Sequence, residues 1–600
     1  MEMENSKEKL SFSSVDYILF ATMMLLSFLI GLYYGFFAKR KQNTTVEYLL
    51  GSKKLKVLPT AISLTATHVS ATTLLGVPAE MYKYGTQYWA CAISGIIVTL
   101  AVNYVFLPVF HEIGSASCYA YLEHRYNHQV RRFASFLFFV YVVVLSPLLC
   151  YTPALAFSQV SGINLHYITP ILVFVCVFYT TFGGLRAVVY TDTLQFSAMI
   201  LAVCVVMILG TKEVGGIANV FEIANDGGRL VWFDFDPNPF LRSSFWMVSV
   251  GLTSMWISNV GITPECVQRF VAIPNLKDAK KTVWIFGVGH MLIKLFSVYN
   301  GLLIFAKYSI KKCDPVFNGD VKKYDQIFPY YVMDVARKIP GLPGLFIVGA
   351  LSAALSSMSS CLNSLSGTAY EDFIRPYWPN ATEKQASTTM KILTFSIGCV
   401  CFVLVFVVEH LGGVFSIGIA FSGVTSGTLL GLFTMGMISR RFNTKGALWG
   451  SLIATTVVSF IMIGAQINIY RGNLRYETMP FDVERCDVAD NSSFIYSKNP
   501  TVYRENSNFD NSSVHWIFRI NYMYYSLIGT ILVAVCGYPI SILTGGTENL
   551  DPKLLSPLFR GSYKPEIEKP PVELKFIEYN SEEIEKLKDY NEKKDVEADV

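Results

Sequence analysis

Residues 63–76 read SLTATHVSATTLLG, which places a run of polar side chains inside an apolar segment long enough to cross a lipid bilayer. Its polar members include Thr65, Thr67, His68, Ser70, Thr72 and Thr73. A helix broken at membrane depth is tolerated only where its backbone is buried in protein or lines a cavity. Such breaks build the midplane sites of secondary transporters, where freed carbonyl groups hold a cation. The alternative is an unbroken helix that uses Ser and Thr for packing against its neighbours.

The composition of the whole chain indicates an all-α polytopic membrane protein. Hydrophobic residues make up 52% and charged residues 16% of the 600 residues, and the mean hydropathy is +0.40. Soluble domains carry about 25% charged residues, so this balance excludes a soluble enzyme. We predict thirteen apolar spans, at residues 15–37, 57–81, 86–110, 133–158, 163–182, 187–210, 244–262, 283–306, 345–369, 390–408, 412–436, 446–466 and 521–543.

The basic residues set the predicted orientation. Lys and Arg gather in short loops that follow odd-numbered spans, such as 39–56, 125–132 and 440–445, and such loops face the cytoplasm. Residues 1–14 are then extracellular, 15–545 form the transmembrane domain, and the C-terminus is cytoplasmic. The first span lacks a cleavage-site pattern, so we expect it to be retained.

The two longest outer loops, 308–344 and 467–520, differ from the inner loops in the modifications that they would receive. Asn491 and Asn511 begin N-glycosylation motifs in the second of them. Two further motifs, at Asn43 and Asn380, fall on the inner side, so we expect them to stay bare.

Cysteine usage leaves one pairing open. Most of the twelve cysteines lie within spans, as small packing residues do. Cys313 and Cys486 instead lie in the two outer loops, where an oxidising setting permits a disulfide. The sequence does not show whether these two residues meet.

The last segment, residues 546–600, has mixed charge, several prolines and too little apolar content to fold by itself. Its terminal Ala598-Asp599-Val600 is the kind of sequence that a tail-binding protein captures through the C-terminal carboxylate. An inert cytoplasmic tail is the alternative.

A second interrupted segment lies five spans after the first. Gly251, Gly261 and Pro264 interrupt residues 244–262, and the residues between them include Thr253, Ser254, Ser258 and Asn259. Interrupted segments at matching positions of two halves indicate an inverted-repeat transporter. Spans 2–6 and 7–11 would be the repeats, with one helix before them and two after.

Two groups of residues have the chemistry of a cation site. Asp192 lies just inside the sixth span, with Gln195 after it; a carboxylate there indicates a functional site or, alternatively, a structural pair with Arg186 or a hydroxyl. The serine-rich ninth span can present the hydroxyls of Ser356 and Ser357 and the Ala353 carbonyl to one small volume. Hard cations prefer such oxygens; small-residue helix packing is the alternative.

Together these segments resemble the sodium:solute symporter family. The motifs that carry the resemblance are GGLRAVVYTDTLQ (183–195), Val267-Gln268-Arg269, the ninth span with Asn363-Ser364, and GTLLGLFTMG (427–436) followed by Asn443 and Lys445-Gly446-Ala447. The resemblance implies a five-plus-five inverted-repeat core and sodium-coupled alternating access. It assigns the shared sodium site to the carbonyls of Ala66, Val69 and Ala353 and to the hydroxyls of Ser356 and Ser357. It assigns a further sodium to Asp192.

The resemblance also bears on the solute. Where the sugar branch has Glu and Gln, this chain has Ala92 and Ile419, which cannot hold sugar hydroxyls. The motif at 427–436 and residues 463–466 are most similar to the monocarboxylate and multivitamin branch, although Thr263-Pro264-Glu265 departs from that branch. The predicted solute contacts are Thr67, Thr72, Thr73, Asn259, His290 and Lys294.

His290 and Lys294 are four residues apart, hence on one face of the eighth span. Lys294 is too deep in its span to reach the interface easily, so its ammonium needs an anion or a strong dipole. That partner is either the carboxylate of a solute or a buried acid within the bundle.

We therefore predict a plasma-membrane symporter that imports a small organic anion with sodium. Alternatives are a carrier of iodide, choline or another small solute, and a sensor or sodium channel on the same scaffold. The sequence has no nucleotide-binding loop, metal cluster or nucleophile arrangement, so we expect neither an enzyme nor a nucleic-acid partner.

Overall fold

The computed structural model describes residues 12–37, 44–53, 55–115, 117–321, 324–336, 339–408, 414–486, 502–503, 509–545 and 550–560. Contacts within the chain group Met1–Phe559 into one compact unit, and that unit is described below. Several predictions lie outside the described residues: those on residues 1–11, Asn43, Asn491, the side chain of Thr72, and the terminal Ala598-Asp599-Val600.

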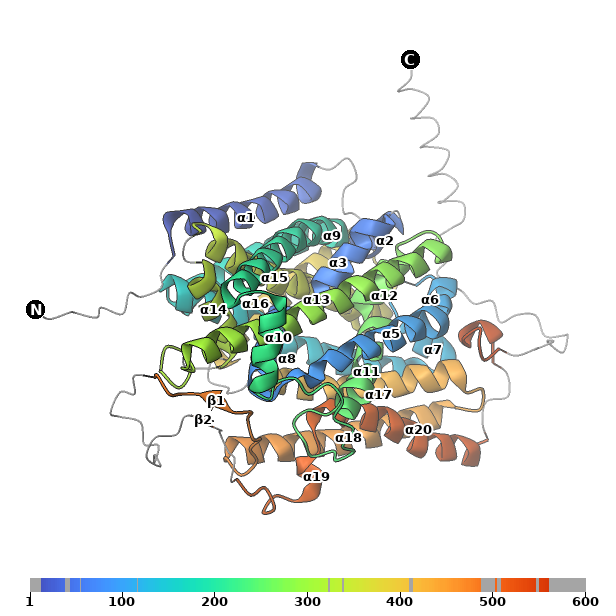
Figure 1. Ribbon diagram of the computed structural model, residues 1–600. Helices are drawn as coiled ribbons and strands as arrows, with labels where there is room; N and C mark the ends of the chain where they lie inside the picture. The colour runs from blue at the N-terminus through green and yellow to red at the C-terminus, as the bar shows by residue number, and fades with distance from the viewer. Residues whose placement is uncertain are drawn as a thin grey trace, which may run out of the picture. The chain divides into compact units, whose positions relative to one another are not determined.

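The described chain is built almost entirely from helices, most of them roughly parallel (Figure 1). The first half contains α1 (Ser14–Leu32), α2 (Thr45–Leu50), α3 (Val57–His68), α4 (Ala71–Tyr84), α5 (Cys91–Ala101), α6 (Leu107–Ile113), α7 (Ala120–Arg125), α8 (His128–Ser161), α9 (Leu165–Val214) and α10 (Ile217–Asp226). The second half contains α11 (Leu252–Gly261), α12 (Pro264–Val271), α13 (Leu276–Lys311), α14 (Ile327–Ala336), α15 (Leu342–Ala369), α16 (Glu383–Val408), α17 (Val414–Ile438), α18 (Thr444–Tyr470), α19 (Trp516–Arg519) and α20 (Tyr525–Leu543). Two short strands, β1 (Phe481–Asp482) and β2 (Val502–Tyr503), pair antiparallel.

Among the described residues, ten helices are long and apolar enough to cross a membrane, which differs from the thirteen predicted spans. One reason is α9, which contains the predicted spans 163–182 and 187–210 in a single helix. The loop expected between them is a bend at Gly184, whose φ of 56° suits glycine because it has no Cβ. The other reason is that the predicted spans 57–81 and 244–262 each fall on shorter helices.

Both predicted breaks are present. α3 ends at His68 and α4 begins at Ala71, and the Ser70 side chain accepts the Thr73 N–H at the start of α4. In the seventh span, α11 ends at Gly261 and α12 begins at Pro264. An unbroken, merely hydroxyl-rich second span is therefore wrong. The helical segment continues past the predicted limit at residue 262, because Pro264 begins a new helix, the position that proline favours.

α15 is the central helix. It is buried along almost its whole length and packs against α9, α8 and α3, whereas α1, α18 and α20 expose much more of their apolar surface. A helix that is covered on every side belongs to the core of a bundle. Any polar side chain on α15 therefore faces another helix and not lipid.

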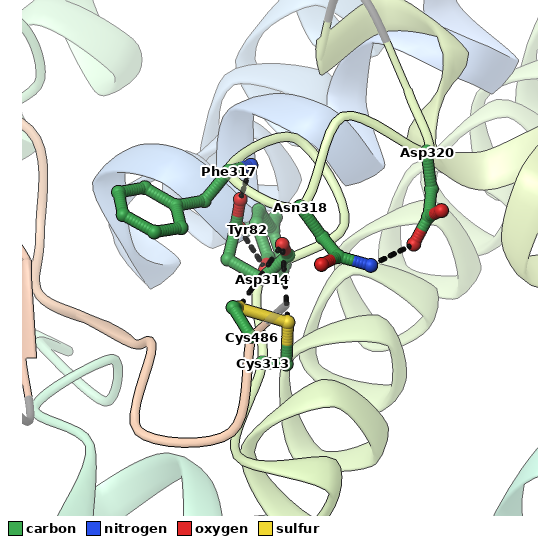
Figure 2. The surroundings of a disulfide bond; sticks show 7 residues. All are labelled: Tyr82, Cys313, Asp314, Phe317, Asn318, Asp320 and Cys486. Carbon is green, nitrogen blue, oxygen red and sulfur yellow. Dashed lines mark hydrogen bonds between the residues drawn. A yellow bond between two sulfur atoms is a disulfide. The ribbon is translucent and has the colours of Figure 1, made fainter. Parts of the chain in front are cut away.

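One end of the bundle, here called the loop end, carries the two long predicted outer loops. There Cys313, which follows α13, is joined to Cys486, which follows β1, by a disulfide bond (Figure 2). Beside it the Tyr82 hydroxyl of α4 donates to the Asp314 carboxylate at 2.5 Å. Burial raises the pKa of Asp314.

Residues 474–486, here called the strap, cross the last turn of α4. The Met479 N–H donates to the Lys83 carbonyl, and the Phe481 ring stacks on Tyr82 with centroids 5.2 Å apart. The buried Arg229 donates to the Tyr82 carbonyl at 3.0 Å and lies over the Phe305 ring. The strap and Arg229 thus fix the loop-end half of the second span.

The opposite end, here called the tail end, carries α2, α6 and α7 (Figure 1) and residues 550–560. The Tyr121 hydroxyl donates to the Leu554 carbonyl at 3.1 Å, and the Ser556 N–H donates to the Met437 carbonyl at 3.0 Å. The predicted tail from residue 546 included this segment. Residues 550–560 pack nevertheless, because Leu554 and Leu555 bury their side chains against the bundle.

Candidate functional site

The two broken helices meet at their breaks. His68, the last residue of α3, has its Nε2 atom 2.9 Å from the Sγ atom of Cys266 in the first turn of α12. Trp256 of α11 and His290 of α13 complete a ring cluster, with centroids 6.0 Å and 6.3 Å from that of His68. The breaks, although about 200 residues apart in sequence, therefore enclose one region.

The serines of α15 reach the break of the second span. The Ser357 Oγ atom lies 2.7 Å from the Thr67 carbonyl oxygen and 3.0 Å from the Ala353 carbonyl oxygen. In the described chain no backbone N–H donates to the carbonyls of Ala66 or Val69, because the helix stops between them and their usual partners. The Ser357 hydroxyl can donate to either carbonyl, so hydrogen bonding as well as small-residue packing joins α15 to the break.

These oxygens suit a hard cation. Ser356, fully buried on the next position of α15, has no hydrogen-bond partner for its hydroxyl within the described residues. A buried polar atom without a partner is costly, and a bound cation would satisfy it. Oxygen ligands from carbonyl and hydroxyl groups are the type that sodium-like ions prefer. The residues present therefore fit a cation at this place.

Asp192 lies beside this group. It is fully buried in α9, and its Oδ2 atom accepts from the Ser63 hydroxyl at 2.7 Å and from Arg269 Nη2 at 3.2 Å. Its Oδ1 atom makes no hydrogen bond of standard geometry to any described residue, although the Ser356 hydroxyl lies close to the carboxyl group. Asp192 and the α15 serines thus share one polar region.

Two neighbours of Asp192 in sequence are not part of this region. Arg186 donates to the Gly51 carbonyl at 2.9 Å, so the predicted pairing of Asp192 with Arg186 is wrong; the bend at Gly184 turns Arg186 toward the tail end. Gln195 donates to Ser27 of α1 at 2.8 Å. Asp192, Arg186 and Gln195 thus contact different parts of the chain.

The predicted solute contacts divide into two groups. Thr67 donates to the Ser63 carbonyl and lies 3.0 Å from Ser360, while Thr73 belongs to the cap of α4. The backbone of Asn259 accepts the Thr263 hydroxyl at the second break. These three residues take part in hydrogen bonds that shape the breaks.

The second group, His290 and Lys294, lies in the ring cluster. The Lys294 ammonium is 3.6 Å from the centroid of the Trp256 ring, and the residue is only 3% exposed. No acidic side chain of the described residues forms an ion pair with it. Within the part of the chain that the structure describes, both ring nitrogens of His290 and the Nε1 atom of Trp256 are also buried without partners. The buried-acid partner considered for Lys294 is therefore absent here, and the lysine charge rests on an aromatic face.

Sequence reasoning missed the roles of Trp256 and Arg269. Trp256 lies among the polar residues of the broken seventh span, and this position could have indicated that its ring lines the site. Arg269 appeared only as part of a family motif, although a buried arginine requires an acid nearby. Asp192, the acid that was predicted to need a cation, was the signal that could have identified Arg269 as a partner.

The chain has clear relatives. Residues 48–454 match the sodium:solute symporter family. Sodium-coupled monocarboxylate transporter 1 of Mus musculus is 34% identical over 562 residues, which cover 92% of this chain and 91% of that protein. The sodium-dependent multivitamin transporter of Oryctolagus cuniculus is 32% identical, covering 90% and 84%. A solved structure of a Na+-coupled sialic acid symporter aligns with a TM-score of 0.71 at 21% identity, covering 90% of this chain and 100% of that one.

Proposed function

We propose that this chain, which belongs to the sodium:solute symporter family, carries a small organic anion into the cell together with sodium. It is a multi-pass membrane transporter and not an enzyme, and sodium is its coupling ion. Relatives named for monocarboxylate and multivitamin transport support an organic carboxylate as the solute.

The proposal that the solute is an anion rests on Lys294. A lysine ammonium buried without a carboxylate needs compensation, and a solute carboxylate supplies it. The unpartnered donors of His290 and Trp256 stand around the same point and would hydrogen-bond to such a carboxylate. Discrimination against a neutral analogue follows, because that analogue leaves these donors unpaired.

Sodium coupling is proposed to act through the second span. A sodium ion held by the carbonyls of Ala66, Val69 and Ala353 and the hydroxyls of Ser356 and Ser357 joins α3 to α15. Asp192 is the proposed ligand of a further sodium. Binding of sodium then favours one arrangement of the bundle, and a bound solute completes it before both are exposed to the other side.

The topology is proposed from the sequence pattern together with the helices. The two broken spans and the bent α9 give thirteen crossings with a five-plus-five core. The loop end faces the outside of the plasma membrane, because a disulfide between Cys313 and Cys486 persists in oxidising surroundings. Residues 1–14 are then extracellular, and residues 546–600 form a cytoplasmic tail whose end a partner protein captures.

Asn511 is half-buried and lies beside the first residues of the strap. Its amide oxygen accepts the Arg475 N–H at 3.0 Å, and its Nδ2 atom donates to the Arg475 carbonyl. A glycan replaces one of the two Nδ2 hydrogens, so one remains for that bond. Asn511 and Asn491 are the proposed glycan sites, and Asn380 on the opposite side stays bare.

The test of the function is uptake of labelled solutes in sodium and in choline buffers. The panel contains lactate, pyruvate, a short-chain fatty acid, a vitamin carboxylate, a sugar, iodide and choline. Sodium-dependent accumulation of carboxylates supports the proposal, while accumulation of only iodide or choline overturns the organic anion. Current without accumulation of any solute indicates a channel or sensor and overturns transport.

The matching variant is Lys294→Gln. Loss of a hydrogen bond to a charged group costs about 1.5–3 kcal/mol, so the apparent affinity for the carboxylate should fall about tenfold to a hundredfold. Half-saturating sodium should stay the same. The control is Lys307→Gln on the same helix, whose ammonium already pairs with Glu213 and Asp334. An unchanged solute affinity in Lys294→Gln at normal surface expression would rule out the role of Lys294.

A further inference from the structure

Arg269 ties the inner half of the seventh span to the proposed sodium region. The residue is fully buried in α12, and its Nη2 atom lies 2.6 Å from the Ser360 Oγ atom and 3.2 Å from Asp192 Oδ2. Its Nη1 atom donates to the Glu265 carbonyl of its own helix. One guanidinium therefore connects α12 with α15 and α9.

The connection extends to the broken second span. Ser63 of α3 donates to the same Asp192 oxygen that Arg269 contacts, and Thr67 lies 3.0 Å from Ser360. The inner halves of both broken helices are thus joined through Asp192 and Ser360. Ser360 stands one helical turn from Ser356 and Ser357, on the same side of α15.

This ion pair is left incomplete. Among the described residues, Asp192 Oδ1 and Arg269 Nε are buried and make no hydrogen bond of standard geometry, although the Ser356 hydroxyl lies close to the carboxyl group, and the single charged contact is not bidentate. A buried ion pair stabilises a fold only when its remaining hydrogen-bonding groups are satisfied. The Arg269–Asp192 pair does not meet that condition, so stability alone does not account for it.

A second buried pair at the tail end shows the contrast. Asp372, which follows α15 in a short π-helix (Tyr370–Ile374), is fully buried and accepts from Arg131 and Ser117 on one oxygen and from Ser135 on the other. Arg131 also pairs with Glu123. Every oxygen of Asp372 is used, as expected of a structural pair.

We propose that Arg269 is a tethered cation that competes with sodium for Asp192. In the sodium-free carrier its guanidinium neutralises the carboxylate and holds α12 against α9 and α15. A sodium ion that arrives beside Ser356 attracts the same carboxylate and repels the guanidinium, so the hold on α12 weakens. Arg269 is therefore a positioning residue that sets the sodium affinity and returns the inner half of the seventh span when sodium leaves.

The experiment measures sodium binding without transport, and it rests on the proposed sodium site. Purified full-length protein is melted over a series of sodium concentrations, with choline keeping the ionic strength constant, because a ligand that binds the folded state raises the melting temperature. Arg269→Gln should lower half-saturating sodium about tenfold or more, the scale on which one neighbouring charge shifts an ionic equilibrium. Arg269→Lys keeps the charge and should stay near the wild-type value.

Two comparisons separate an effect on sodium binding from an effect on stability. Arg131→Gln should lower the melting temperature without changing half-saturating sodium. Should Arg269→Gln not fold, Asp192→Asn is compared with Asp192→Asn/Arg269→Gln, in which no buried charge is left alone. Without the carboxylate the guanidinium still repels sodium, so its removal should still lower half-saturating sodium, but by less than in the wild-type background.

Unchanged half-saturating sodium on removal of Arg269, in a wild type that sodium does stabilise, overturns the competition alone. A wild type whose melting temperature does not respond to sodium overturns the sodium site, and the competition with it.

Discussion

The two broken spans are anchored at opposite ends of the molecule and by different chemistry. α4, half of the second span, is held at the loop end by the strap, which a disulfide fixes and whose Phe481 ring stacks on Tyr82. α12, half of the seventh span, is held toward the tail end by the Arg269–Asp192 ion pair. Sodium has no means of competing with a disulfide or an aromatic stack, but it competes directly with a guanidinium for a carboxylate. A coupling ion can therefore act on the anchor of α12 and leave the anchor of α4 in place.

The strongest test of this contrast removes the two hydroxyls of the proposed sodium site on α15. Ser356→Ala/Ser357→Ala deletes two hydroxyls at about 1.5–3 kcal/mol each, so half-saturating sodium should rise about a hundredfold or more and uptake should collapse. Surface expression should be largely kept, because alanine is a good helix former. Uptake at graded sodium with surface labelling measures both quantities. An unchanged sodium dependence would remove these serines from the mechanism.

An intermediate effect is expected from the anchor of α4. Cys486→Ser, alone or with Cys313→Ser, opens the disulfide and should lower the free energy of unfolding by about 2–4 kcal/mol, the usual contribution of a disulfide. Half-saturating sodium should not change, because the strap lies far from the charges around Asp192. Thermal melting at several sodium concentrations gives both values, and a membrane-impermeant reductant on wild-type protein should reproduce the variant. A shift in sodium affinity would show that the two anchors are not independent.

The smallest effect is expected from the ion pair between Lys312 and Glu484 at the edge of the strap. Both side chains are about half exposed, and exposed pairs contribute little to stability. Lys312→Gln should therefore leave the melting temperature unchanged within error. The hydrogen bond from Lys312 lowers the pKa of Glu484. Whatever stabilisation the pair gives is present above the ordinary pKa of a glutamate and is lost as the pH falls through the lowered value. A clear drop in melting temperature at neutral pH would mean that the strap depends on charge as well.

The sequence was sufficient for features that depend on local chemistry. The breaks at His68 and at Gly261 were predictable because polar residues, glycine and proline interrupt spans that are otherwise apolar. The serines on α15 were predictable as a polar face turned toward protein, because a helix face that contacts lipid has no use for so many hydroxyl groups. The assignment of residues on α3 and α15 to one sodium site came from the family resemblance.

What the sequence did not give depends on how helices are rotated against one another. Asp192 has Arg186 near it in sequence, yet its cation is Arg269, because α9 bends at Gly184 and α12 begins anew after the second break. Lys294 was expected to have either a solute or a buried acid, and the aromatic face of Trp256 was not foreseen. Contacts between side chains of distant spans follow from packing angles and register, which no local pattern records.

The disulfide has a consequence for the order of biosynthesis. Cys313 and Cys486 are 173 residues apart, and α15, α16, α17 and α18 all lie between them. Since the chain is made from the N-terminus, Cys313 waits as a thiol until four long helices have been inserted and the second loop has reached the same side of the membrane. The bond between the two cysteines can therefore close only on a chain whose intervening helices have been inserted with the correct orientation. The disulfide therefore forms only in chains that have completed the insertion of these helices.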